Sequence, residues 1–147
     1  MPEHIDPTVR VLVHEVYARY SQAFDGGDVD RCSTLFTEDA VFTSGANTSI
    51  AGKPAIEDFL HLATERSTGM HHFVSNIVLD GRRDDQVIDG SATVLALRVD
   101  DGALTLAALG RYRDELVMDG GAWRFRSRTI ETSIGPELKG ALVAGSR

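Results

Sequence analysis

The residue types best suited to chemistry in this sequence fall on one predicted strand. The stretch Met70–Leu79 alternates with a period of two, which is typical of a strand and places His72 and Asn76 on the same face as Val74. Buried polar groups are costly unless they are hydrogen-bonded, so we expect His72 and Asn76 to form the floor of a small pocket, paired with a ligand or with a neighbouring side chain. The opposite face carries Phe73 and other apolar residues, so we expect the strand to be covered on both sides.

An imidazole in such a pocket is suited to general acid–base chemistry, because histidine changes its charge near neutral pH. Other reaction classes have less support. Cys32 is the only cysteine and lies in a predicted helix without an activating partner, which is typical of a small core residue. His71 points away from His72, and no third ligand stands at a recognisable spacing, so the adjacent histidines do not predict a metal site.

The elements that must position these residues begin with a long helix. Asp6 is a capping residue and Pro7 suits the first turn, after which apolar residues recur at helical spacing from Val9 to Phe24. Gly26-Gly27 predicts the end of this helix. Asp25 then lies in the last turn, where a carboxylate meets the negative end of the helix dipole, so its position requires an explanation.

Two shorter helices and a run of strands are expected after it. One helix follows Asp28 through residues 29–36, and another runs from Lys53 to about residue 66. Strands are predicted at residues 40–43, 48–51, 70–79, 87–99, 104–118 and 122–133. Helices followed by long hairpin-linked strands are typical of an α+β domain. We therefore expect the helices to pack on one face of a curved antiparallel sheet, whose cone leaves a pocket at its open end.

Length and charge restrict the class of protein. A chain of 147 residues suits one domain, which we place over residues 1–147 with a core at about 9–133 and a tail at 134–147. The net charge of -7 indicates no overall nucleic-acid footprint, and no apolar run is long enough to span a membrane. Because the N-terminus lacks a signal-peptide pattern, we expect a cytoplasmic protein. The late arginines are interpreted as a solvated strand face: Arg111, Arg113, Arg124, Arg126 and Arg128.

Several segments together resemble a known family. They are Tyr20–Asp28, Leu35–Phe42, Gly52–Ile56, His72–Asn76, Gly110–Asp114 and Trp123–Phe125. Over about residues 9–133 the chain resembles the SnoaL-like branch of the nuclear transport factor 2-like superfamily. The resemblance implies a cone-shaped, cystatin-like α+β barrel. The superfamily includes scytalone dehydratase, bile-acid dehydratases, polyketide cyclases, ketosteroid isomerase, the small subunit of ring-hydroxylating dioxygenases and members without known catalysis.

The resemblance also implies a catalytic pair. Dehydratases of this group have a pocket aspartate where the first helix ends and an inward histidine on the next long strand, and Asp25 and His72 resemble these positions. Tyr20 resembles a pocket tyrosine on the same helix. Asp25 would fix the tautomer of His72, and the free ring nitrogen would take a proton from carbon next to a carbonyl or hand one to a leaving hydroxyl. Tyr20 or Tyr112 would donate a hydrogen bond to the developing enolate oxygen.

Five further contacts with a substrate are expected. Asn76 would orient the substrate, and the pocket would also be lined by Phe24, Phe42, Val74 and Tyr112. These parts are sufficient for elimination of water, double-bond isomerisation or aldol-type cyclisation, with no metal or organic cofactor. The sequence thus favours a cofactor-independent lyase or isomerase, of dehydratase or cyclase type, that acts on a small hydrophobic oxygenated molecule.

Two alternatives from other classes stay open. The same fold could hold a hydrophobic ligand or a partner without catalysis, or could serve as a subunit like the small chain of a dioxygenase. Relatives commonly form homodimers through the outer face of the sheet, and apolar residues on both faces of residues 87–99 and 104–118 permit such contacts. We therefore expect a homodimer or a higher homo-oligomer.

Overall fold

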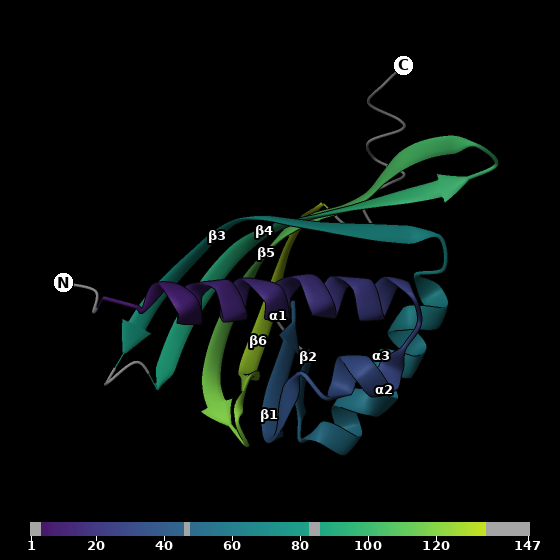
Figure 1. Cartoon of the computed structure of the whole chain (residues 1–147). Coiled ribbons are helices and arrows are strands. Elements are labelled where there is room, and N and C mark those ends of the chain that lie inside the picture. The colour runs from purple at the N-terminus through teal and green to yellow at the C-terminus, as the bar shows by residue number, and fades with distance from the viewer. Residues whose placement is uncertain (1–3, 46–47, 83–85, 135–147) are drawn as a thin grey trace.

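The structure of the chain is a computed structural model that describes residues 4–45, 48–82 and 86–134. Its helices are α1 (Pro7–Asp25), α2 (Val29–Ser33) and α3 (Lys53–Arg66). Its strands are β1 (Phe36–Ser44), β2 (Thr48–Ala51), β3 (Met70–Arg82), β4 (Val87–Asp100), β5 (Ala103–Asp119) and β6 (Ala122–Ile134). Figure 1 shows α1 lying across the curved sheet, with α2 and α3 together beside it.

The predicted order of helices and strands is confirmed, with small differences at the ends of elements. Helix α2 is shorter than predicted, because Phe36 already begins β1. The predicted tail, apart from Ile134 at the end of β6, lies outside the described residues. None of the described helices combines the length and the apolar character needed to cross a membrane.

The six strands form one sheet in the order β2-β1-β6-β5-β4-β3. Neighbouring strands run antiparallel except β1 and β6, which run parallel. The sequence predicts an antiparallel sheet, and the single parallel pair among the described strands has a topological cause. The chain passes from β2 through α3 to β3 at the far edge, and successive hairpins then bring β6 back beside β1. With β2 and β3 at its two edges, the curved sheet stays unclosed (Figure 1).

Local signals in the sequence determine where α1 begins and ends. The side chain of Asp6 accepts a hydrogen bond from the backbone N–H of Thr8 at 2.7 Å, as an N-cap does. Gly26 caps the C-terminus, and Gly27 has a φ of 69°, a conformation that glycine adopts without steric cost. The predicted helix end is therefore confirmed, and Asp25 is the last helical residue.

The core lies between α1 and the face of the sheet that it covers. Tyr17 meets Phe125 edge to face, with ring centroids 5.6 Å apart. The ring of Tyr20 lies 6.0 Å from those of Phe36 and Phe125 and 6.4 Å from that of Tyr112. Edge-to-face contacts at these distances are favourable beyond the area they bury. The aromatic cluster thus joins the C-terminal half of α1 to β1, β5 and β6.

A bulge interrupts β3 in the middle of its predicted alternation. The pairing of β3 with β4 shifts register between Ser75 and Val78, and Asn76 has a φ of 53°. Because an irregularity of this kind reverses the facing of the residues beyond it, Asn76 is exposed and Ile77 packs against the core. The prediction that Asn76 shares a pocket face with His72 is therefore wrong.

The outer face of β3 is open in the single chain. Phe73 and Val78 are each 56% exposed, so the prediction that both faces of this strand are covered is wrong for the described chain.

A second irregularity changes the facing of β6. The pairing of β5 with β6 shifts register next to Glu115, at the level of Arg126. Arg126 stays partly exposed and forms an ion pair with Glu115, whereas Arg128 turns inward and is entirely buried. The interpretation of the late arginines as a solvated face is therefore wrong for Arg128.

Candidate acid–base site

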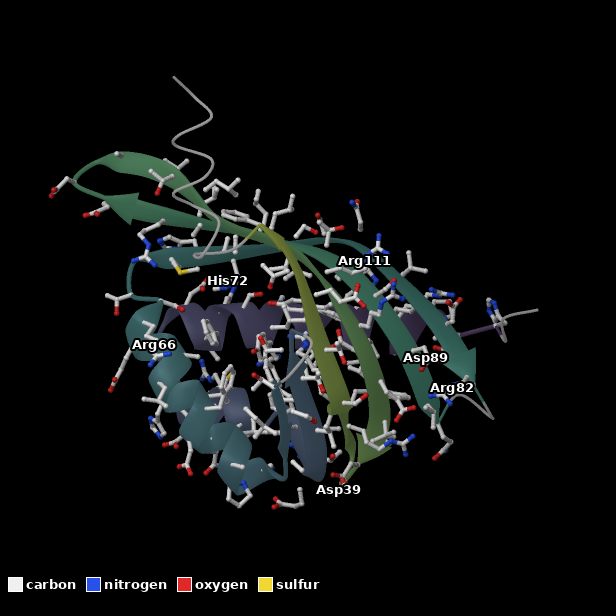
Figure 2. The ribbon with its side chains drawn as sticks, turned by 180° about the vertical axis from the view of Figure 1, so that it is seen from behind. Asp39, Arg66, His72, Arg82, Asp89 and Arg111 are labelled. Carbon is white, nitrogen blue, oxygen red and sulfur yellow. The ribbon has the colours of Figure 1, made fainter. Side chains whose placement is uncertain are left out.

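Asp25 and His72 lie in direct contact where the end of α1 meets β3. One carboxylate oxygen of Asp25, Oδ2, accepts a hydrogen bond from the backbone N–H of His72 at 2.8 Å. The other, Oδ1, lies 2.6 Å from the ring nitrogen Nδ1 of His72. The side chain of Asp25 is 17% exposed and that of His72 is 15% exposed. Figure 2 shows His72 in the space between β3 and α1.

This geometry explains the position of Asp25 and assigns the tautomer of His72. The two N–H donors of His72 satisfy a carboxylate that would otherwise meet the negative end of the helix dipole. Because an ionised carboxylate only accepts hydrogen bonds, Nδ1 carries the proton in this contact. In the neutral ring the remaining nitrogen, Nε2, is then the basic one.

The imidazole borders a small cavity of about 70 Å³. Its walls come from α1, α3 and four of the strands, and they are formed by Tyr20, Phe24, Phe42, Phe59, Ala63, His72, Tyr112 and Ile130. The ring of Phe24 stands edge to face with the imidazole, at a centroid distance of 5.1 Å. Apart from His72, Tyr20 and Tyr112, the lining residues are all apolar.

Most of the predicted site residues are brought together here. The cavity that His72 borders is also lined by four other predicted residues: Tyr20, Phe24, Phe42 and Tyr112. Asp25 lies outside this lining and contacts the imidazole ring of His72 through Nδ1. Two predicted residues do not line this cavity: Asn76 is exposed, and Val74 lines a second hollow of about 370 Å³ between α1 and β3, which His72 also borders. The prediction that Asn76 lies at the pocket floor beside His72 is therefore wrong, whereas Val74 shares a hollow with His72 but does not line the aromatic cavity.

Three lining residues escaped the sequence reasoning: Phe59 and Ala63 on α3, and Ile130 on β6. Phe59 and Ala63 stand four residues apart, a spacing that predicts a shared helix face. The same spacing does not say what that face covers. Ile130 follows the irregularity in β6, so simple alternation from the start of that strand does not place it.

The two cavity tyrosines are hydrogen-bond donors at neutral pH. Burial raises the pKa of Tyr112 to about 12, against an opposing effect of the nearby Arg128 cation. Burial also raises the pKa of Tyr20 well above its ordinary value. Both hydroxyl groups therefore keep their protons and can donate to an oxygen that becomes negative in the cavity.

A further charged pair lies behind these tyrosines. Arg128 donates hydrogen bonds from Nε and Nη2 to the two carboxylate oxygens of Asp114, at 2.8 and 3.0 Å. The pair spans β5 and β6, where the two residues stand directly opposite each other. Across the described part of the chain, no three His, Cys, Asp or Glu side chains gather as they would to hold a metal ion.

These features define an α+β protein with a curved, unclosed sheet, N-terminal helices across it and a hydrogen-bonded Asp25–His72 pair beside an aromatic cavity. The family described as the SnoaL-like domain matches residues 8–129. The match covers most of the chain, so the chain belongs to the SnoaL-like family, and the resemblance in the sequence is confirmed. A comparison with curated proteins gives no match.

Solved structures share this fold. Aln2 from a Streptomyces species is 27% identical, with a TM-score of 0.79 over 99% of this chain and 100% of that one. A scytalone dehydratase-like protein from Novosphingobium aromaticivorans is 22% identical, with a TM-score of 0.76 over 86% of this chain and 85% of that one. The β subunit of a protein classed with aromatic-ring-hydroxylating dioxygenases, from the same organism, is 18% identical, with a TM-score of 0.72 over 86% and 90%.

Proposed function

We propose that this protein is a cofactor-independent lyase or isomerase, of dehydratase or cyclase type, that acts on a small hydrophobic oxygenated molecule. The observation that carries the proposal is the Asp25–His72 contact at the wall of an aromatic cavity. One imidazole nitrogen is committed to the carboxylate, so the other serves as the base. The likeness to a scytalone dehydratase-like protein and the membership of the SnoaL-like family support the same class of reaction.

The chemistry follows from the order of the contacts. Nε2 of His72 takes a proton from a carbon next to a carbonyl group, and the negative charge passes to the carbonyl oxygen. Tyr20 or Tyr112 donates a hydrogen bond to that oxygen as the charge develops. The imidazolium, held by Asp25, then returns the proton to another carbon or to a leaving hydroxyl group, so the enzyme ends as it began. A positioned base of this kind contributes about 10²–10⁴-fold to the rate.

The size of the cavity limits the substrate. Its volume of about 70 Å³ is well below the roughly 300 Å³ at which ordinary ligand pockets begin. A single small ring is therefore the largest group expected to enter with limited adjustment of the walls. A larger substrate must either displace side chains of the cavity wall or keep part of itself outside the cavity.

Proton abstraction can be tested before the natural substrate is known. Cyclohexenone is a small enolisable ring compound, and exchange of its acidic hydrogens in deuterium oxide is followed by NMR. We expect the protein to accelerate exchange, His72→Gln to abolish the acceleration and Asp25→Asn to reduce it. His71→Gln is the matched control, because His71 is the exposed neighbour on the opposite face of β3.

The result also separates catalysis from simple binding. A protein that only holds a ligand would bind cyclohexenone without accelerating exchange, and His72→Gln would change nothing but affinity. Equal exchange rates with the unaltered chain and with His72→Gln would contradict the proposal.

We further propose that the chain forms a homodimer or a higher homo-oligomer. The supporting observation is a set of exposed large apolar side chains on β3, β4 and β5: Phe73, Val78, Val99, Leu104 and Leu106. Exposed apolar residues on neighbouring strands are typical of protein contact surfaces. The alternative to self-association is that these side chains contact a different protein chain, as in a subunit role. A dioxygenase β subunit has a similar fold. Sedimentation of the purified chain distinguishes the two, because only self-association yields an oligomer without a partner.

A further inference from the structure

Arg128 occupies an unusual place for an arginine. Its side chain is entirely buried, and so is the side chain of its partner Asp114. Its guanidinium carbon lies 3.8 Å from the ring centroid of Tyr112 and 4.4 Å from that of Tyr20. The same group lies 4.1 Å from the ring centroid of Phe125. A permanent cation thus lies against both tyrosines of the candidate site without lining the cavity itself.

Stability alone does not explain this ion pair. Burying two charges costs about as much as their attraction returns, so a pair of packed apolar side chains would serve a purely structural core equally well. The guanidinium is also incompletely satisfied, since its Nη1 has no hydrogen-bond partner among the described residues. The presence of a charge there indicates another role.

We propose that Arg128 is a positioning residue that holds the rings of Tyr20 and Tyr112 and makes the cavity select an oxygen that carries negative charge. The proposal rests on the proposed function, because it assigns these two tyrosines as donors to a developing enolate. Arg128 does not touch the substrate. It acts through the two phenol rings, and Asp114 holds the guanidinium plane in place by its two hydrogen bonds.

The physical basis is the electrostatics of an aromatic ring with a cation against it. A cage of aromatic rings would by itself suit an ammonium group, because ring faces carry partial negative charge. Here the cation of Arg128 already occupies that position for Tyr20 and Tyr112. Its field disfavours a second cation in the cavity and makes the hydroxyl groups better donors. Burial raises the pKa of Tyr112 and Arg128 lowers it, and a lower pKa also makes a hydroxyl group a better hydrogen-bond donor.

The test uses 4-nitrophenol, a single-ring compound whose neutral and ionised forms differ in colour. Absorbance of the bound probe across a pH series measures the preference of the cavity for the phenolate over the phenol. We expect the unaltered protein to prefer the phenolate. The double variant Arg128→Met/Asp114→Asn removes both buried charges together. We expect its preference for the phenolate to fall by at least about tenfold. This effect is smaller than the roughly 10²–10³-fold loss that follows removal of a direct oxyanion donor.

Arg126→Met is the matched control. Arg126 lies two residues away on β6 and pairs with Glu115 on β5, but it is partly exposed and does not contact the tyrosines. We expect it to retain the phenolate preference. A folded double variant with an undiminished preference would overturn the proposal, and so would an unaltered protein that binds only the neutral phenol or does not bind the probe.

A second variant covers the case in which the double variant does not fold. Arg128→Lys keeps the charge but loses the planar fork that Asp114 holds. The chain has 3 tyrosines, and the ring centroid of each lies within 5.3 Å of the guanidinium carbon of Arg128. The tyrosine contribution to the near-ultraviolet circular dichroism spectrum therefore comes from this cluster. We expect that signal to weaken in Arg128→Lys and to persist in Arg126→Met. An unchanged tyrosine signal in Arg128→Lys would count against positioning.

The outcomes separate the two proposals. If cyclohexenone exchange fails while the phenolate preference follows Arg128, then the catalytic proposal fails alone. If exchange depends on His72 while the preference ignores Arg128, then the positioning proposal fails alone.

Discussion

Two carboxylates, Asp25 and Asp114, are each paired with a nitrogen-bearing side chain beside the same aromatic cluster, and the pairs differ in how far water reaches them. Asp25 and His72 keep about a sixth of their side-chain surface exposed, at 17% and 15%. Asp114 and Arg128 keep none. Each carboxylate accepts two N–H hydrogen bonds from its partner residue, so local geometry does not distinguish them.

Access and chemistry distinguish the two pairs. An imidazole at a cavity wall can gain and lose a proton, which suits it to acid–base work. A guanidinium keeps its proton at any ordinary pH. A fully buried arginine can therefore orient the side chains around it but cannot transfer protons. In the proposed function, the group that transfers protons and the fixed cation are thus separate residues, and Tyr20 and Tyr112 border both the cavity that His72 lines and the guanidinium of Arg128.

The largest expected effect is on stability and belongs to the sealed pair. Asp114→Ala leaves the cation of Arg128 buried without a counter-charge, and breaking a buried pair in this way costs about 3–5 kcal/mol. Urea unfolding followed by circular dichroism measures the loss. The double variant Arg128→Met/Asp114→Leu should recover most of it. A loss below about 1 kcal/mol in Asp114→Ala would show that the two pairs are energetically alike.

The accessible pair should show the reverse pattern. His72→Gln is expected to reduce the rate of cyclohexenone exchange by about 10²–10⁴-fold. Its free energy of unfolding should change by only about 1 kcal/mol, since the backbone N–H of residue 72 still donates to Asp25 and the introduced amide can replace the ring N–H. Measuring exchange and urea unfolding on the same sample tests both parts. A large stability loss without a loss of rate would reverse the comparison.

Alkaline pH should affect the rings between the pairs. Burial raises the pKa of Tyr112 from 10.0 to about 12, so the unfolded chain ionises first as the pH rises. The stability that this tyrosine contributes is present below pH 10 and is lost between about pH 10 and about pH 12, to a total of about 3 kcal/mol. Burial also raises the pKa of Tyr20, so Tyr112→Phe should make this decline shallower without removing it, which urea unfolding at a series of pH values measures.

A smaller effect is expected at Gly90 on β4. A Cβ atom there would clash with the hydroxyl oxygen of Tyr17, the third tyrosine beside Arg128. Gly90→Ala must therefore push Tyr17 away, at a cost of about 1–3 kcal/mol. Thermal unfolding measures the loss. The cyclohexenone exchange rate should change less than in His72→Gln, because Tyr17 lies outside the cavity lining.

Much of the architecture could be predicted because its signals are local. Asp6 before Pro7 marks the start of α1, and Gly26-Gly27 marks its end, since caps and glycine turns act within a few residues. The glycine turn at Gly102 sits where β4 is joined to β5. The cluster of Tyr20, Phe24 and His72 follows from these elements, because helical and strand spacing place those residues on inward faces.

Two errors share one physical cause. The predictions for Asn76 and Arg128 both assume that strands alternate without interruption, and both residues lie at or just beyond an irregularity in pairing. A bulge depends on the register of the neighbouring strand, which is distant in the sequence. Alternation in one strand therefore carries no signal of it, and every residue past the bulge is placed on the wrong face.

By itself the sequence determined the helices, the strands, the family and the candidates Asp25, His72 and Tyr20, because each depends on short-range spacing or on a recognisable set of motifs. Only the tertiary structure decided that Asp25 contacts His72 through two hydrogen bonds, that Phe59 and Ala63 close the cavity, and that Arg128 is sealed against Asp114. These facts depend on which strands lie side by side and in what register, and such long-range pairings are set by the packing of the whole chain.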